Sequence, residues 1–303
     1  MRLHLAILAG LISTTLAAAQ STPAKGAPPA QGAATQAQPT TGSHQPQART
    51  QDEFNAYQAA AAESDPAKLE AAADAFAQQY PSSELRALLY VRDMSLYQQA
   101  NNAAKVIEVG RKAIAMDAMN PVPLVNVASA LAETTHESDL DHDARLAEAS
   151  KDAQGAIDNI NNLQVPPNAP ADRVARVKAS ILSMAYDTLG VVDMNKKDWA
   201  AAEINLQKAT DASKTQPEGV IYLRLSVVQD NQKKYPQALD SATKAVQYSP
   251  EGSPEQNLAK QQVSRVQKLL MSGATPAPAP TQPPAANNPS APPPQGSTPP
   301  QPH

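Results

Sequence analysis

Two stretches of the chain decide the fold: NKKDWAAAEINLQKA at 195–209 and NQKKYPQALDSATKA at 231–245. An aromatic residue, an alanine three positions on and a second alanine seven beyond recur with an offset of 36: Trp199 and Tyr235, Ala202 and Ala238, Ala209 and Ala245. Spacings of three, four and seven place side chains on one face of a helix. The fixed offset therefore predicts a repeated helical unit.

Each stretch follows another helical pattern, so it supplies the second helix of a pair, within 183–216 and 219–252. Small residues on the first helices, Gly190 and Ser226, are predicted to let the second helices approach closely. Both segments resemble the tetratricopeptide repeat (TPR), a 34-residue helix–turn–helix. One such unit cannot bury its apolar stripe alone, so neighbouring units must stack.

The resemblance is weaker over the rest of the interior. We predict weaker pairs at 51–81 and 87–120, a divergent pair at 121–162, one long helix at 170–195 and a capping helix at 254–272. The stretch FAQQYPSS at 76–83 resembles the F-x-x-x-YP-x-S pattern of TPR proteins in bacterial envelope assembly systems. The fold class implied for 51–271 is all-α: a right-handed α–α superhelix, or TPR-like solenoid, with disordered termini. The alternative is an irregular helical bundle that contains two matching pairs.

The chain begins MRLHLAILAGLISTTLAAAQ, with Arg2 before a short apolar run and a small-residue exit. This pattern is typical of a cleaved secretory signal peptide, here 1–19. The run is shorter than the roughly 20 residues that cross a bilayer, although an uncleaved anchor is the alternative. The chain has no cysteine, which excludes a lipoprotein anchor and disulfides. We therefore expect an exported, periplasmic or secreted protein whose mature chain has no transmembrane segment.

The regions that flank the interior have a different composition. Residues 20–50 are rich in Pro, Gln and Thr, and residues 272–303 contain no charge and 12 of the 28 prolines. Such segments bury too little apolar surface to offset the entropy of chain ordering. We predict a disordered linker at 20–50 and a disordered Pro-rich tail at 273–303. The simpler interpretation is a solvated spacer, and the alternative is a tail that binds an aromatic groove.

The interior is acidic. All 29 Asp and Glu residues lie within 50–271, together with 22 of the 25 Lys and Arg residues (all except Arg2, Lys25 and Arg49), which gives a net charge of −7. Proteins that bind nucleic acid need a basic face. We therefore expect no nucleic-acid partner.

Motifs of common enzymes are missing: the sequence contains no G-x-G loop, no P-loop and no G-x-S-x-G elbow. The polar cluster HESDLDHD at 136–143 is the one candidate metal site. His136 and His142 have the wrong separation for one helix face, and a calcium loop would need Gly and Glu where Ala144 and Ser150 stand. We interpret the cluster as a solvated loop and predict no catalytic residue, metal or cofactor. A hydrolase that uses this cluster is the least favoured alternative.

By resemblance to TPR arrays, the first helices line a concave groove that binds peptides. The predicted groove residues are Asp187, Val191, Met194 and Asn195 in one unit and Leu223, Val227, Asp230 and Asn231 in the next. Some family members bind a C-terminal carboxylate with Asn and Lys there, but Val191 and Val227 occupy the usual Asn positions. The groove is therefore predicted to be apolar, with Asp and Asn at its rim, and to suit a peptide with apolar anchors and a basic residue.

The function predicted from this pattern is a non-enzymatic TPR scaffold or adaptor that binds a protein or peptide partner in the bacterial cell envelope. The alternative is an accessory or regulatory subunit of an envelope enzyme or of a secretion or assembly complex. A simpler interpretation of the groove is that its side chains only coat the superhelix. The aromatic residues are interpreted as repeat core rather than as a ligand-stacking surface. The sequence leaves the partner and the oligomeric state open.

Overall fold

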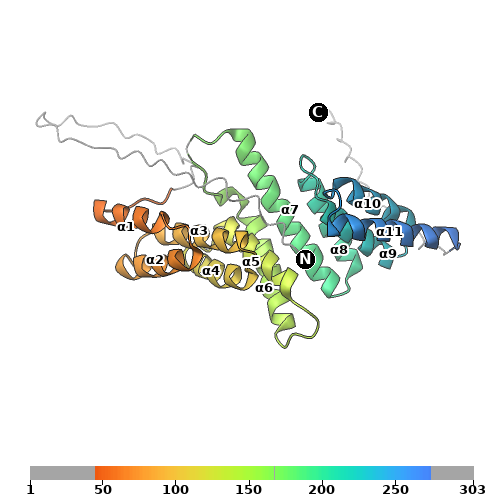
Figure 1. Cartoon of the computed structure of the whole chain (residues 1–303), viewed down its shortest axis with the longest axis horizontal. Helices are drawn as coiled ribbons and strands as arrows, with labels where there is room; N and C mark the ends of the chain where they lie inside the picture. Colours follow the sequence, from red (N-terminus) through yellow and green to blue (C-terminus); the bar gives the residue numbers. More distant parts are fainter. Residues whose placement is uncertain (1–44, 167, 274–303) are drawn as a thin grey trace, which may run out of the picture.

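The computed structural model describes residues 45–166 and 168–273, which form eleven α-helices, one short 3₁₀ helix and no β-strand. The helices follow one another in a row, and the long α7 lies between the N-terminal and C-terminal groups (Figure 1). In chain order they are α1 (Gln51–Ala61), α2 (Pro66–Gln79), α3 (Leu85–Gln99), α4 (Ala103–Met116), α5 (Pro121–Thr134), α6 (His142–Asp158), η1 (Ile160–Asn162), α7 (Ala171–Asn195), α8 (Trp199–Ala212), α9 (Gly219–Asn231), α10 (Tyr235–Tyr248) and α11 (Pro254–Met271).

Successive helices pack as hairpins. Helix α3 packs on α4, α5 on α6, α7 on α8 and α9 on α10, and each hairpin contacts the next. Helix α11 packs on α10 and α9 and ends the described row. The buried apolar side chains form four clusters along the row instead of one central core. This arrangement confirms the predicted all-α, TPR-like solenoid with its long helix and its capping helix.

Helix starts follow the capping signals in the sequence. The Ser253 hydroxyl accepts the Gln256 amide proton (3.1 Å), and the Gln256 side-chain oxygen accepts from the Gly252 amide (3.1 Å). The box at Thr50–Glu53 is built in the same way. Prolines stand in the first turn of four helices, where their missing N–H needs no partner: Pro66, Pro121, Pro236 and Pro254.

The turns inside three hairpins share one backbone conformation. A non-glycine residue has a positive φ in each: Asn101 (54°), Lys197 (58°) and Lys233 (59°). The next amide then bonds the carbonyl five positions earlier, as Asp198 does to Asp193 (2.9 Å). This is a Schellman ending, in which glycine is the usual left-handed residue. The repeat therefore includes the connection between the helices as well as the helices themselves.

Small residues meet the partner helix near the open end of each C-terminal hairpin. The Ser183 hydroxyl of α7 donates to the Ala209 carbonyl of α8 (3.1 Å). At the matching position of the next hairpin, Gly219 lies against the Ala245 carbonyl, and an added Cβ would stand 2.8 Å from that oxygen. A serine hydroxyl that donates a hydrogen bond and a glycine without a Cβ therefore both allow the two helices of a hairpin to approach closely.

Serine and glycine also occupy matching positions near the closed end of these hairpins. The Ser226 hydroxyl of α9 donates to the Ala238 carbonyl of α10 (2.7 Å). At the matching position of α7, an added Cβ on Gly190 would lie 2.7 Å from Leu206 Cγ and 3.6 Å from the Ala202 carbonyl oxygen. The close approach predicted at Gly190 and Ser226 is therefore confirmed.

The aromatic residues that begin the second helices lie between neighbouring elements. Trp199 of α8 is half-buried against a cluster that includes Ile221 and Leu225 of α9. Tyr235 of α10 is buried with Val266 of α11. Each aromatic side chain therefore packs where one hairpin meets the next element, as the repeat pattern predicts.

The packed part of the chain begins before residue 51, where the sequence analysis places it. The Gln45 side chain donates to the Val165 carbonyl (2.6 Å), and Ala48 packs against the buried cluster of the N-terminal hairpins. The Arg49 amide donates to the Glu53 carboxylate (2.7 Å). The prediction of a disordered linker is therefore corrected for 45–50, since these residues cover the N-terminal hairpins.

The remaining predictions for the chain ends lie outside the described residues. These are the signal peptide at 1–19, the linker at 20–44 and the tail at 274–303. In the part of the chain that the structure describes, no helix has both the length and the apolar composition needed to cross a membrane.

Candidate peptide-binding face

The predicted groove lies on the first helices of the two C-terminal hairpins. Asp187, Val191, Met194 and Asn195 lie on α7, and Leu223, Val227, Asp230 and Asn231 lie on α9. We call the side of α7 and α9 that carries these eight side chains the first-helix face. The two carboxylates of this face are bound to arginines of the same chain, whereas part of its apolar surface is accessible.

Arg224 joins three helices behind the first-helix face. Its guanidinium bonds the Asp187 carboxylate of α7 through Nη1 and the Glu133 carboxylate of α5 through Nη2. All three side chains are nearly enclosed, with 12% exposure for Arg224, 15% for Asp187 and 19% for Glu133. One cation therefore holds together the first helices of three successive hairpins, α5–α6, α7–α8 and α9–α10.

Burial sets the charge of this triad. Desolvation raises the pKa of Asp187 to about 6; Arg224 opposes this rise, whereas Glu133 and Glu218 add to it. Desolvation also acts to lower the pKa of Arg224, but Asp187 and Glu133 outweigh it, and the pKa ends above its usual range. The triad contains two acids and one base, an excess of acid that favours a basic group at its margin.

Asp230 does not lie free at the rim of the face. Its carboxylate is buried and accepts hydrogen bonds from the Gln262 side chain (3.0 Å) and from Arg265 of α11. These contacts fasten the capping helix to α9. The expectation of available Asp side chains at the rim is thus corrected, because Asp187 and Asp230 both bind arginines of the same chain.

The apolar residues of the face divide into two groups. Val191 packs against the buried cluster of the N-terminal hairpins, and Met194 packs against the cluster of α8 and α9. Leu223 and Val227 are half-buried and belong to none of the four clusters. The apolar surface left for a partner is therefore centred on Leu223 and Val227, one turn apart on α9.

The two asparagines have matching roles at the ends of the first helices. The Asn195 amide donates to the Val191 carbonyl (2.9 Å), and the Asn231 amide donates to the Val227 carbonyl (2.8 Å). Each side-chain nitrogen is thus used within its own helix. The side-chain oxygen of the exposed Asn231 is the polar group of the face best placed to accept a hydrogen bond from a partner.

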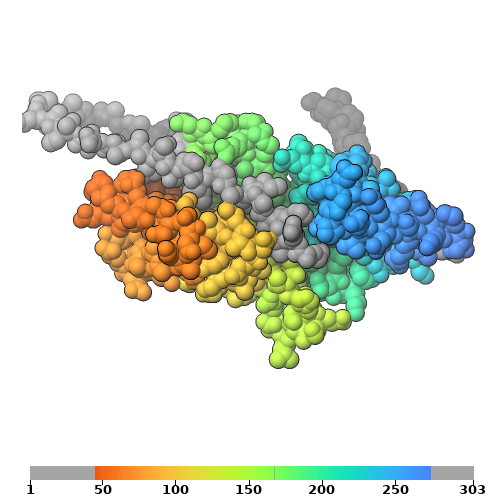
Figure 2. Space-filling model, viewed as in Figure 1, coloured from red at the N-terminus to blue at the C-terminus, as the bar shows by residue number. Residues whose placement is uncertain are grey.

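The histidine cluster does not assemble into a metal site. His136 lies 3.8 Å from Asp139, and His142, the first residue of α6, lies 2.9 Å from Asp143. Among the described residues no group of three or more His, Asp or Glu side chains is arranged to hold a metal ion. Figure 2 shows the α5–α6 connection projecting from the body of the molecule, with Leu140 at full exposure. Each histidine is thus paired with a nearby carboxylate of the same turn.

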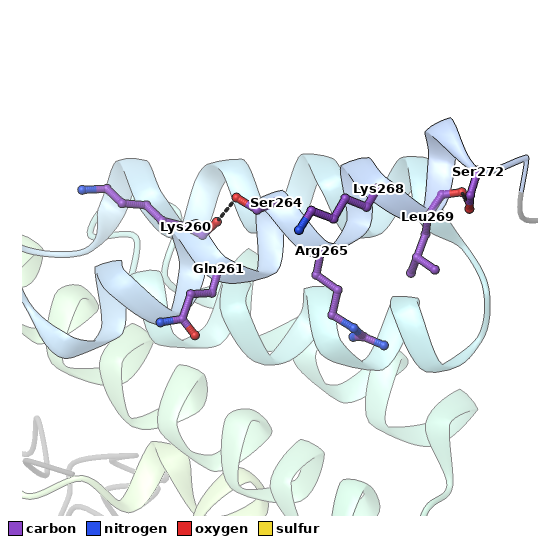
Figure 3. A pocket seen from close by; sticks show the side chains of 7 residues that line it. All are labelled: Lys260, Gln261, Ser264, Arg265, Lys268, Leu269 and Ser272. Carbon is purple, nitrogen blue, oxygen red and sulfur yellow. Dashed lines mark hydrogen bonds between the residues drawn. The ribbon is translucent and has the colours of Figure 1, made fainter.

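A shallow hollow runs along the outer side of α11 (Figure 3). Its lining residues are Lys260, Gln261, Ser264, Arg265, Lys268, Leu269 and Ser272. Arg265 is already bound to Asp230 of α9. The hollow is formed by a single polar helix face, as expected for the cap of a solenoid.

Arg224 and Glu133 were not predicted from the sequence. They are 91 positions apart, and neither belongs to the small-residue and aromatic pattern that reveals the repeat. The only signal was a single arginine within the mostly apolar run GVIYLRLSVV at 219–228, which is an unusual place for a solvated cation. Such a position predicts a buried partner without identifying it.

Comparisons with known proteins leave the fold as the main guide. No protein-family model matches the chain, and no curated protein is similar to it in sequence. Among solved structures, the crystal structure of the APC/C hetero-tetramer Cut9-Hcn1 contains a similar chain, with a TM-score of 0.30 and 14% identity. The similarity covers 69% of this chain and 48% of that chain, so this chain spans about half the length of its structural neighbour.

Proposed function

We propose that this chain is a non-enzymatic TPR-like scaffold that binds a protein or peptide partner through the first-helix face of α7 and α9. The observation that carries the proposal is the pair Leu223 and Val227. Both are half-buried apolar side chains on a helix whose other aliphatic residues belong to a core cluster. Adjacent apolar anchors one turn apart are what helical or extended peptides bind in grooves between helices.

The charges near this pair favour a partner with a basic residue. The Arg224 triad has one more carboxylate than guanidinium, and Glu218 lies close enough to raise the pKa of Asp187 further. A lysine or arginine of a partner would complete the charge balance at this margin. Electrostatic complementarity of this kind contributes orientation and association rate more than affinity.

The proposed location is the bacterial cell envelope. The basis is the signal-peptide pattern at 1–19 and the FAQQYPSS stretch at 76–83. In the structure, Phe76 and Tyr80 of this stretch pack with ring centroids 5.0 Å apart and ring planes tilted by 41° at the end of α2. The Pro-rich tail would act there as a spacer.

A second candidate is an accessory or regulatory subunit of an envelope enzyme or assembly complex. The projecting α5–α6 connection favours it, because Leu140 is fully exposed there among acidic residues. A subunit of a complex needs a second contact surface of this kind. In this function the first-helix face and the projection would bind different components.

The test is a comparative pull-down with the mature chain from residue 20. The variant Leu223→Arg/Val227→Arg places two charges on the apolar surface left for a partner, and the control Gln237→Arg places one at an exposed position of α10. We expect one specific partner to be lost from the double variant and kept by the control. An unchanged set of partners in all three samples would remove the first-helix face as the binding site.

A further inference from the structure

A partly buried polar layer joins α2, α3 and α4 at the N-terminal end of the array, far along the chain from the first-helix face. Tyr90, Asp93 and Tyr97 lie on one side of α3, at helical spacings of three and four. The Tyr90 hydroxyl donates to Asp74 of α2 (2.7 Å), and the Tyr97 hydroxyl donates to Glu70 of α2 (2.8 Å). The two tyrosines therefore fasten α3 to α2.

Lysines of α4 complete the layer. Lys112 bonds both Glu70 (3.1 Å) and Asp74 (3.0 Å), and Lys105 bonds Glu70 (3.1 Å) and Glu108 of its own helix (3.0 Å). Each ammonium also lies over a tyrosine ring, 5.6 Å from the Tyr90 centroid and 5.9 Å from the Tyr97 centroid respectively. The tyrosine hydroxyls and the lysine ammonium groups therefore bind carboxylates of α2 or, for Lys105, also Glu108 of α4.

Asp93 is the one acid of this layer that receives none of them. Its side chain is fully enclosed, at 0% exposure, and neither carboxylate oxygen has a hydrogen-bond partner. The two other helices that contact α3, namely α1 and α5, contain no lysine or arginine. Their charged residues are the acids Asp52 and Glu53 of α1 and Glu133 of α5. A buried carboxylate without a partner is far more costly when ionised than when protonated.

Burial and the charges around Asp93 also favour its protonated form. Burial raises the pKa of Asp93 to about 7; Glu70 and Asp74 add to the rise, whereas Lys112 and Lys105 oppose it. An unfolded aspartate titrates near about 4. The folded state therefore holds the proton more tightly than the open state, so folding stability falls as pH rises from about 4 to about 7 and then levels off.

We propose that Asp93 is a proton-controlled latch at the junction of α2, α3 and α4. When Asp93 is neutral, the N-terminal hairpins stay closed around the layer. When it ionises, α2 and α4 separate from α3 more often, while the C-terminal hairpins, which carry the first-helix face, are unaffected. The N-terminal end of the array thereby becomes the part that responds most strongly to a change of pH between mildly acidic and neutral.

The test is amide hydrogen exchange of the folded chain, expressed as protection factors so that the intrinsic pH dependence of exchange is removed. Between pH 5.5 and 7.5 we expect protection in α2–α4 to fall about 20-fold, as the release of one proton predicts. Protection in α8–α10 should change by less than about fivefold, because the raised pKa of Asp187 gives these helices a smaller response of the same sign. The variant Asp93→Asn, which is neutral at all pH values, should lose the pH dependence.

A matched control uses Asp152 of α6, a second buried acid whose pKa burial raises to about 6. Asp152→Asn should keep the response of α2–α4. Should Asp93→Asn fail to fold, the carboxyl carbon of Asp93 is followed by NMR in the unsubstituted chain, where its titration must coincide with the loss of protection. A flat protection profile in the unsubstituted chain, or a response that persists in Asp93→Asn, would overturn the proposal.

Discussion

The hairpins α5–α6 and α9–α10 have the same architecture but different internal contacts. In α9–α10, Lys244 lies over the Tyr222 ring (6.0 Å). Two other tyrosine–lysine pairs, Tyr90–Lys112 and Tyr186–Lys208, have the same separation in the sequence. At this separation α5–α6 has Asn126 and Glu148 instead. Asn126 accepts from Gln98 of α3, and Glu148 accepts from Arg111 of α4 (2.7 Å).

This difference shows that two different sets of side-chain contacts can stabilise the same helix-pair geometry. The regular hairpins hold themselves together by contacts that repeat along the sequence. The irregular hairpin is held by an apolar cluster shared by α5, α6 and α7, and also by polar contacts to the preceding hairpin. Its first helix is deeply buried: eleven residues of α5, Asn126 among them, are enclosed. Loss of the sequence period at 121–162 therefore does not interrupt the stack.

Arg224 connects the two hairpins, and its loss should have the largest effect. Arg224→Met keeps the length of the side chain but leaves Glu133 and Asp187 buried without their cation. We expect a loss of about 3–5 kcal/mol in the free energy of unfolding, measured by urea denaturation. The control is Arg176→Met on exposed α7, where the ion pair with Asp172 should contribute less than about 1 kcal/mol. Equal, small losses in both variants would refute the structural role of the triad.

Replacing glycine by alanine should change stability in opposite directions in the regular hairpin α7–α8 and in the irregular hairpin α5–α6. Gly190→Ala should destabilise by about 1–3 kcal/mol, because the new methyl group overlaps Leu206. Gly155→Ala in α6 should stabilise by about 0.5–1 kcal/mol, because its methyl group would stand 3.5 Å from Leu124, an ordinary contact, and alanine favours the helix. Thermal unfolding of both variants checks the pair. Changes of the same sign would contradict the close approach at Gly190.

The smallest expected effect concerns the turns. Lys233 adopts a left-handed conformation, whereas no described residue of the α5–α6 connection has a positive φ. Lys233→Gly removes a strain of about 1 kcal/mol but also loosens the unfolded chain, so we expect a net stabilisation of at most about 0.5 kcal/mol. High-precision urea denaturation detects a change of this size. A clear destabilisation would show that the Lys233 side chain has a role beyond the turn.

Much of the fold could be predicted from the sequence because its signals are local. The alanines at 202, 209, 238 and 245 and the aromatics at 199 and 235 mark helix faces directly, and the capping residues mark helix starts. The residues 45–50 have no apolar run, so their packing against the N-terminal hairpins is not visible in composition.

The candidate site was less predictable because its electrostatics are not local. The sequence indicates that Asp187 and Asp230 lie on first helices, but not that Arg224 and Arg265 neutralise them from other elements. In the same way, Asp93 is one acid among many in the sequence. Only the three-dimensional arrangement shows that the two lysines next to it are bound to other carboxylates.

The most direct test of the account is site-specific photocrosslinking from the first-helix face in cells that express the chain. A photoreactive residue is placed at Leu223 or Val227 of α9 and, as the control, at exposed Gln237 of α10. We predict the same crosslinked partner from Leu223 and Val227 and none from Gln237. Crosslinks that form equally from all three positions, or only from Gln237, would contradict a partner-binding face on the first helices.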